Sequence, residues 1–272
     1  MKSILTALVL SLSLSANAAK HLFSGSDTMA GLLTDAIVAS GMDQSIGYVG
    51  GGSSVGEKAL VAGEINMTGM SREIKPEAVQ QLKALGVVAK EHVIALDGLS
   101  IFVNSSNPVR GMNFSTLTKI FSCEYTNWSQ VPGAGKTGAI KAFRRNDVSG
   151  TTDTFKSLVG IKKFGDCVTI SAETVDIAEQ TARDPDAVGY AGESGKKDGN
   201  RAIGIAATGE AYVLPATSTI RNGSYPLSRK LYIYEATGAR KANRVEQQLL
   251  EQVLDRSFMD PIVQDHDFVT ID

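Results

Sequence analysis

The sequence has few of the residues on which several kinds of binding or catalytic site depend. Its 272 residues include two cysteines, three histidines and one tryptophan, and aromatic residues make up 6%. So few aromatic rings give no platform on which nucleic-acid bases could stack. The histidines, His21, His92 and His266, are not spaced as metal-ligand pairs, and no H-E-x-x-H motif occurs. We therefore expect no metal and no cofactor.

A strong excess of charge and long apolar runs are also absent. The formal net charge is −2, which disfavours binding to the phosphates of nucleic acids. No run of 18 apolar residues occurs, so no transmembrane helix is predicted. Hydrophobic residues make up 43% and charged residues 21%, both close to the globular average. Glycine is frequent at 27 residues, which indicates tight turns or backbone that approaches a ligand closely.

The first 18 residues have the three parts of a secretory signal peptide. A positive start at Met1 and Lys2 precedes an apolar run over residues 4–14. Residues 15–18, Ser-Ala-Asn-Ala, then offer a small-x-small cleavage site. The apolar run is too short to span a bilayer, and a buried N-terminal helix is the alternative. We expect cleavage near Ala18 and an exported protein.

The two cysteines, Cys123 and Cys167, are expected to form a disulfide. An oxidising compartment outside the cytoplasm allows them to pair. Closing a loop of about 45 residues stabilises by roughly 4 kcal/mol in the chain-entropy model. Their separation is far too long for a C-x-x-C zinc or redox motif. Two buried free thiols are the alternative.

Short apolar runs alternate with amphipathic helical patterns along the chain. Strands are predicted at residues 21–23, 45–49, 93–96 and 99–103, and helices at residues 29–40, 56–62, 151–158 and 243–254 among others. Strand, loop and helix in repetition indicate an α/β fold with parallel sheets covered by helices. No repeat or proline-rich linker marks a domain boundary. Two lobes joined by strands that cross between them would explain this.

Four loops rich in serine, threonine or glycine share a chemistry that suits an anion. Each follows a predicted strand, and three run into helices; they are residues 26–28, 52–54, 68–72 and 145–152. A helix N-terminus offers free N–H groups and partial positive charge, and small hydroxyl side chains add donors. Loops at the carboxyl ends of parallel strands converge on one crevice. Arg145 adds a planar fork for two oxygens. Any one loop by itself is better explained by ordinary N-caps, but the four loops together, one with an arginine, predict a shared anion site.

One of these loops also fits two other motifs. Residues 52–56, Gly-Ser-Ser-Val-Gly, match the G-x-S-x-G nucleophile elbow of serine hydrolases. Ser54 would then be the nucleophile, with a downstream aspartate and His266 as partners. The segment also approaches a P-loop, but Glu57 stands where that motif needs lysine, which excludes nucleotide binding here. The hydrolase remains an alternative.

The loop that contains Arg145 carries a resemblance to a known family. Residues 145–155, RNDVSGTTDTF, resemble the R-x-D-x-S-G-T-x-x-x-F segment of phosphate-binding proteins from bacterial phosphate ABC transporters. Residues 50–56 resemble the second phosphate loop of that family, and residues 225–234 resemble the segment by which its shorter members return to their first lobe. The resemblance covers most of the mature chain. It implies a two-lobed periplasmic binding protein fold of type II, with a ligand cleft between lobe 1 (residues 19–97 and 232–272) and lobe 2 (residues 98–231).

Carried over by position, the resemblance implies phosphate contacts from both lobes. The implied residues are Thr28, Ser53 and Ser71 from lobe 1 and Arg145, Ser149, Gly150 and Thr151 from lobe 2, with Asp147 pairing with Arg145. Ser71 departs from the family, since many members have an aspartate there that accepts the proton of phosphate and repels sulfate. A serine hydroxyl either donates or accepts, so phosphate binding is kept and sulfate rejection is left open; Asp27 is an alternative acceptor. Arg72 is either a second anion contact or a surface charge.

These observations predict a periplasmic protein that binds inorganic phosphate by closing its lobes around the anion and that breaks no bond. Delivery to an ABC transporter permease in the inner membrane is implied by the resemblance. Two alternatives stay open. One is a binding protein for another tetrahedral oxyanion such as sulfate, and the other is a secreted serine hydrolase that uses Ser54.

Overall fold

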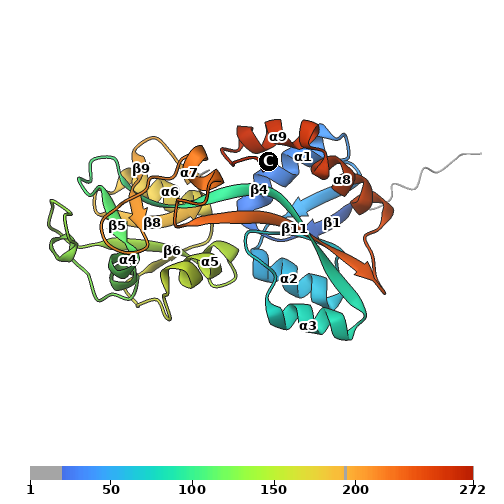
Figure 1. Ribbon diagram of the computed structural model, residues 1–272, viewed down its shortest axis with the longest axis horizontal. Helices are drawn as coiled ribbons and strands as arrows, with labels where there is room; N and C mark the ends of the chain where they lie inside the picture. The colour runs from blue at the N-terminus through green and yellow to red at the C-terminus, as the bar shows by residue number, and fades with distance from the viewer. Residues whose placement is uncertain (1–19, 193–194, 272) are drawn as a thin grey trace, which may run out of the picture.

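Two lobes lie side by side and are joined by two long strands that run from one to the other (Figure 1). The computed structural model describes residues 20–192 and 195–271. The predicted signal peptide, residues 1–18, lies outside the described residues. The joining strands are β4 (Val87–Asn104) and β11 (Ser228–Gly238). Among the described residues, no helix is both long and apolar enough to cross a membrane.

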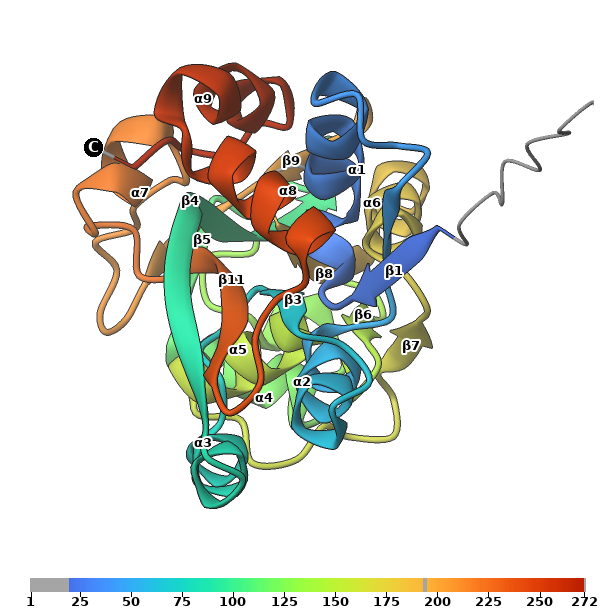
Figure 2. The same ribbon diagram turned by 90° about the vertical axis from the view of Figure 1, so that its right-hand side faces the viewer.

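The first lobe is built around short strands with helices on two sides. Figure 2 shows α1, α8 and α9 on one side of the strands and α2 and α3 on the other. Its elements are β1 (His21–Ser24), η1 (Asp27–Met29), α1 (Ala30–Ala39), β2 (Ile46–Val49), α2 (Ser53–Ala62), β3 (Met67–Met70), α3 (Pro76–Ala84), α8 (Arg244–Leu254) and α9 (Arg256–Asp265). Strands β1 and β2 pair in parallel, with Phe23 opposite Tyr48. The expected parallel strand–loop–helix pattern is therefore confirmed here.

The second lobe holds the middle of the chain. Its elements are β5 (Gly111–Asn113), α4 (Phe114–Phe121), η2 (Trp128–Gln130), β6 (Lys141–Arg145), α5 (Gly150–Val159), β7 (Thr169–Ser171), α6 (Thr174–Arg183), β8 (Ala187–Gly192), β9 (Asn200–Ala202), β10 (Gly204–Ala206) and α7 (Thr217–Arg221). Strand β6 pairs in parallel with both β7 and β8. A disulfide joins Cys123 after α4 to Cys167 before β7, with the Cα atoms 6.0 Å apart, which confirms the predicted pairing.

The strands that cross between the lobes overturn two details of the sequence prediction. Residues 93–96 and 99–103 belong to one strand, β4, instead of two. Strand β4 pairs antiparallel with β11 up to Gly98 and antiparallel with β8 from Leu99 onward, so the expectation of purely parallel sheets is wrong at this point. Gly98 lies at this change of partner, packed closely against Ile220, so a Cβ there would displace the end of the Ile220 side chain, 2.6 Å away. A glycine inside a strand normally indicates a bulge or an interruption, which is why the sequence pattern predicted two strands here instead of one.

Each lobe has its own apolar core. One cluster packs helix residues such as Leu33 of α1 and Leu249 of α8 around Tyr234 of β11. The other cluster contains Trp128, Phe155 and Tyr190. The rings of Phe155 and Tyr190 stack with their centroids 4.1 Å apart. Because burial of apolar surface is what holds each lobe together, the two cores behave as two rigid bodies joined by β4 and β11.

Candidate anion-binding site

The predicted loops of the first lobe come together where β1 and β3 end. Gly25 bridges Gly69 in parallel, and the Ser26 backbone N–H donates to the Gly69 carbonyl at 2.8 Å. The Ser26 hydroxyl donates to Ser71 Oγ at 2.9 Å. Ser53, the first residue of α2, has its Oγ 3.3 Å from Ser71 Oγ and accepts a hydrogen bond from the Ser71 backbone N–H at 3.1 Å. Three hydroxyl groups therefore form a buried cluster at the start of α2.

The second lobe meets this cluster directly. Thr28 Oγ1 and Thr151 Oγ1 are 3.1 Å apart across the cleft, and the Ser54 N–H donates to the Val148 carbonyl at 3.2 Å. Gly150 begins α5, and a Cβ on it would lie 2.2 Å from Ser53 Oγ. Only glycine allows so close an approach without displacing the hydroxyl. The N-terminal ends of α2 and α5 therefore face each other, and the partial positive charges of two helix N-termini meet at the cleft.

Arg145, the last residue of β6, is 1% exposed and reaches toward the first lobe. Its Nη2 donates to Asp27 Oδ2 at 2.5 Å and its Nη1 donates to Thr174 Oγ1 at 2.8 Å. Asp27 also accepts from the Gly51 N–H, at 2.6 Å. The Nε of Arg145 is buried without a hydrogen-bond partner among the described residues, although buried polar groups are normally paired. Arg145 therefore has one buried donor that the described part of the chain does not use.

Asp147 corrects one expectation. It pairs with Arg144, with Oδ1 at 2.7 Å from Nη1, and not with Arg145, and its side chain is 74% exposed. The reason is the pleat of β6, which sends successive side chains to opposite faces. Arg144 faces the turn that carries Asp147, while Arg145 faces the first lobe, where Asp27 is its partner. Ser149 is buried as the N-cap residue of α5, and its hydroxyl makes no cap bond.

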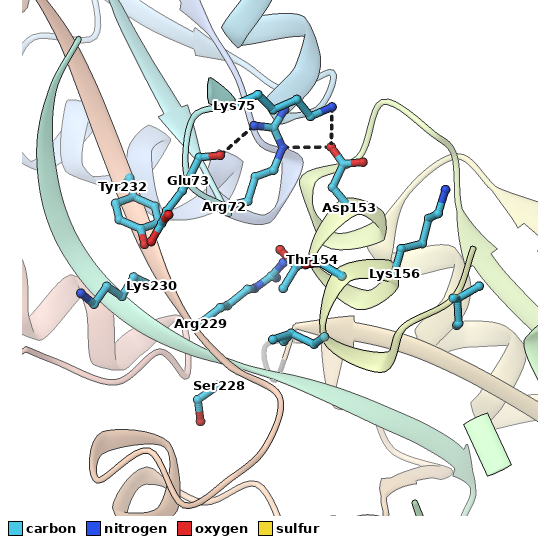
Figure 3. Close-up of a pocket in the computed structure, with 13 residues that line it drawn as sticks. Arg72, Glu73, Lys75, Asp153, Thr154, Lys156, Ser228, Arg229, Lys230 and Tyr232 are labelled. Carbon is cyan, nitrogen blue, oxygen red and sulfur yellow. Dashed lines mark hydrogen bonds and ion pairs between the residues drawn. The ribbon is translucent and has the colours of Figure 1, made fainter. Parts of the chain in front are cut away.

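A second arginine that the sequence did not single out lies in the same region. Arg229 near the start of β11 donates through Nε and Nη2 to Asp97 Oδ2 at 2.8 and 2.6 Å. Its Nη1 donates to Thr151 Oγ1 at 3.0 Å and its Nη2 lies 3.4 Å from Thr28 Oγ1. Figure 3 shows this side chain extending from β11 toward α5. One feature of the sequence could have pointed to Arg229. It lies two residues from each of two leucines, Leu227 and Leu231, which are both buried in the structure. An arginine between buried positions needs a partner, because an unpaired buried charge is unfavourable.

Two buried tyrosines support the loops. The Tyr48 hydroxyl donates to the Ser26 carbonyl at 2.8 Å. Burial, together with the negative charge of Asp27, raises the pKa of Tyr48 well above 10. The Tyr190 hydroxyl lies 2.8 Å from Thr152 Oγ1, and burial raises the pKa of Tyr190 as well. Both phenols are therefore neutral; Tyr48 holds the backbone at Ser26, and Tyr190 holds the Thr152 hydroxyl in the first turn of α5.

The residues of the hydrolase alternative do not form a catalytic group. Ser54 Oγ accepts from Arg72 Nη2 at 3.1 Å and lies 3.4 Å from Asp153 Oδ2. His266 Nε2 is 2.8 Å from Asp35 Oδ2. No hydrogen bond within residues 20–192 and 195–271 joins Ser54 to a histidine, as a serine nucleophile requires. The same residues hold no cluster of three or more His, Cys, Asp or Glu side chains suited to a metal ion.

Arg72 is neither an exposed charge nor part of the hydroxyl cluster. Its side chain is 8% exposed, and it is ion-paired with Glu57 of its own lobe and Asp153 of the other. The site as a whole therefore combines hydroxyl groups, two helix N-termini and two carboxylate-paired arginines, Arg145 and Arg229. Such a group of donors suits an oxyanion with several acceptor oxygens.

Known proteins resemble this chain in sequence and fold. Residues 14–255 match the family model of the PBP superfamily domain. Protein SphX of Synechococcus elongatus is 31% identical over 203 residues, which cover 71% of this chain and 60% of SphX. The phosphate-binding protein PstS of Staphylococcus epidermidis is 31% identical over 208 residues, which cover 75% of this chain and 64% of that protein. The chain thus spans less than two thirds of the length of these relatives.

The fold has a counterpart among solved structures. An ABC-type phosphate transport receptor from Vibrio cholerae matches with a TM-score of 0.73 and 22% identity, covering 92% of this chain and 100% of that chain. At this identity the likeness concerns the fold, and it confirms the expected two-lobed α/β architecture.

Proposed function

Since this chain belongs to the PBP superfamily, we propose that it binds inorganic phosphate in the cleft between its lobes and delivers it to an ABC transporter for uptake. One observation carries this proposal. Hydroxyl groups from both lobes and two arginines converge at the facing N-termini of α2 and α5, with Thr28 and Thr151 only 3.1 Å apart across the cleft. The similarity in sequence to the phosphate-binding protein PstS of Staphylococcus epidermidis supports phosphate as the anion.

Lobe closure is the event that binds the anion. Neither half of the site alone surrounds a tetrahedral ion, because Ser53 and Ser71 lie in one lobe and Arg145 and Thr151 in the other. Closing the lobes by a hinge motion through β4 and β11 dehydrates the ion and completes its hydrogen bonds. The proposed contacts are Thr28, Ser53, Ser71, Arg145, Ser149, Gly150 and Thr151. Asp147 is left out because it is exposed and paired with Arg144.

Arg229 is added to these residues as a positioning group. Asp97 holds its guanidinium by two hydrogen bonds, and the guanidinium in turn donates to Thr151 Oγ1 at 3.0 Å. Because Arg145 and Arg229 are each paired with a carboxylate, their buried charges are compensated in the closed site. Ligand recognition then depends on oriented donors more than on net charge.

The proposal also covers lobe boundaries and location. We place lobe 1 at residues 19–97 and 232–272 and lobe 2 at residues 98–231, because the two apolar clusters separate along these segments almost completely. The exceptions are Val269, which packs on the core of the second lobe, and Leu231, which belongs to the core of the first. An export signal over residues 1–18 would place the mature protein in the periplasm, beside a permease of the inner membrane. Cleavage before Ala19, read by mass spectrometry of the exported protein, would support this.

A thermal melt of the mature protein is the direct test. The protein is unfolded, freed of bound ligand, refolded, and melted with excess phosphate, sulfate or chloride. A ligand at a thousand times its Kd adds about 4 kcal/mol to the free energy of unfolding, or roughly 8–16 °C in Tm for a protein of this size. A rise with phosphate alone supports the proposal. No rise with phosphate contradicts it.

A second candidate is a binding protein for another tetrahedral oxyanion such as sulfate. The observation in its favour is the cluster of Ser26, Ser53 and Ser71, in which hydroxyls and no carboxylate face one another. The carboxylate of Asp27 is already engaged by Arg145 and the Gly51 N–H. Equal rises in Tm with phosphate and sulfate would support this candidate over a selective phosphate protein.

A further inference from the structure

An ion-pair network joins the two lobes at the edge of the cleft. Arg72 follows β3 in the first lobe, and Asp153 lies in the first turn of α5 in the second. Arg72 Nε donates to Asp153 Oδ2 at 2.9 Å, and Lys75 Nζ lies 3.3 Å from the same oxygen. Figure 3 shows both side chains directed at Asp153. One carboxylate of the second lobe therefore holds two cations of the first.

Arg72 is held in place by its own lobe. Its Nη1 donates to Glu57 Oε2 at 2.7 Å and to the Glu73 carbonyl at 2.8 Å. Glu57 Oε2 also accepts from the Lys75 backbone N–H at 2.8 Å, which fastens the loop to α2. When the lobes separate, Arg72 keeps Glu57, and only its bond to Asp153 is lost. The guanidinium is thus oriented in advance for a partner that arrives with lobe closure.

The network lies between the hydroxyl cluster and solvent. Arg72 is next to Ser71 in sequence, and Asp153 is two residues after Thr151. A cavity of about 770 Å³ lies beyond them, between the lobes, and is lined by Arg72, Lys75, Asp153 and Tyr232 among others. Ser53, Ser71 and Thr151 do not line this cavity and are essentially fully buried. Arg72 and Asp153 therefore form part of the wall between this cavity and the hydroxyls, together with Arg229, which lines the cavity and donates to Thr151 Oγ1.

We propose that the Arg72–Asp153 ion pair is an interlobe latch that slows the release of bound phosphate without touching it. This inference rests on the proposed function. The ligand-bound state requires closed lobes, so a contact made only in the closed state increases the fraction of closed protein and with it the apparent affinity. Arg72 and Asp153 are both largely buried, and residues within one ion-pair network commonly show coupling that corresponds to a roughly tenfold effect.

The rate at which radiolabelled phosphate dissociates into excess unlabelled phosphate tests the latch. Asp153→Asn is the principal variant, because Asp153 is the more exposed partner and its loss leaves Glu57 paired with Arg72. We expect the dissociation rate to rise about tenfold, with the association rate and the Tm of the ligand-free protein nearly unchanged. Arg72→Ala should have a similar effect, and the double variant should be no worse than either single variant. Asp184→Asn is the matched control, since it removes the Lys141–Asp184 pair, at 2.6 Å, within one lobe.

Several results would overturn the latch. The latch is ruled out if the wild type binds phosphate normally and Asp153→Asn releases it at the same rate as the wild type. Loss of phosphate binding in Arg72→Ala but not in Asp153→Asn would also rule out the latch, because Arg72 would then be a direct ligand contact. If the wild type binds no phosphate, the proposed function fails, and small-angle X-ray scattering of the ligand-free proteins then tests the latch. Asp153→Asn should be the more open protein, and equal radii of gyration would contradict the inference.

Discussion

Asp27 of the first lobe and Arg145 of the second form an ion pair across the cleft, with Oδ2 and Nη2 2.5 Å apart. The pair joins two loops that are 118 residues apart in the chain. In the closed arrangement it both orients the guanidinium and compensates its buried charge. Because the two residues lie in different lobes, the pair breaks when the lobes separate. The guanidinium of Arg145 is therefore held in this orientation only when the lobes are closed.

Asp27 and Asp147 should therefore differ sharply in their effect on phosphate affinity. Asp27→Ala leaves Arg145 without its cross-cleft partner, and we expect the Kd for phosphate to rise at least about tenfold, since truncating one partner of a buried ion pair is strongly unfavourable. Asp147→Ala removes an exposed pair and should leave the Kd within about twofold. Isothermal titration calorimetry measures both. The larger effect in Asp147→Ala would refute this assignment.

Arg145→Lys should weaken phosphate binding by about 100-fold or more. Lysine has a single point charge in place of a fork, so it cannot serve Asp27, Thr174 and an anion at once. Arg144→Lys is the matched control, because it lies one residue earlier on β6, is also largely buried and faces away from the first lobe. Calorimetry should show little loss of affinity in the control. Comparable losses in the two variants would argue for general damage to β6.

Ser71→Asp should increase the preference for phosphate over sulfate by more than about tenfold. A carboxylate among the hydroxyls of Ser26 and Ser53 accepts a proton from phosphate but has nothing to accept from fully ionised sulfate. Competition calorimetry with the two anions gives the ratio. Ser71→Asn has a similar shape without the charge and should not change the ratio, so equal changes in the two variants would rule out the charge as the cause.

Stability should fall steeply in alkali. Burial raises the pKa of Tyr48, Tyr190, Tyr232 and Tyr234 above the usual value of 10. The folded protein therefore favours the neutral phenols, and their contribution is fully present below about pH 10 and declines as the pH rises further, because the unfolded chain ionises first. Tyrosinate absorbance should rise together with loss of circular dichroism. If all the tyrosines ionise while the circular dichroism is unchanged, the prediction that their ionisation accompanies unfolding is wrong.

The disulfide should stabilise the second lobe without affecting the anion site. Cys123 and Cys167 close a loop with a sequence separation of 44, worth roughly 4 kcal/mol in the chain-entropy model. Replacing both by alanine should lower the Tm by roughly 8–16 °C. The Kd for phosphate, measured below the melting range, should stay the same. A large change in Kd would mean that the disulfide shapes the cleft.

Local features of the sequence were enough for most of the fold and part of the site. Strand-then-helix patterns gave helices close to α1 and α5, and small residues at helix starts predicted that the loops over residues 52–54 and 145–152 share one site, while the individual residues Ser53, Gly150 and Thr151 came from the family resemblance. The predicted helix at residues 56–62 missed the first turn of α2, since Ser53 and Ser54 are poor helix formers inside a helix but favourable at its start. Helix α9, which contains Pro261, was not predicted.

The sequence by itself therefore predicted the α/β class, the disulfide and loops whose hydroxyl and N–H donors suit an anion, because each prediction depends on composition or on residues close together in the chain. The tertiary structure alone decided which charges meet. Arg229 and Asp97 are 132 residues apart, and Arg72 and Asp153 are 81 apart. Such pairs form only where strands β4 and β11 cross and the lobes close, and no local pattern specifies which of many arginines and carboxylates will be brought together there.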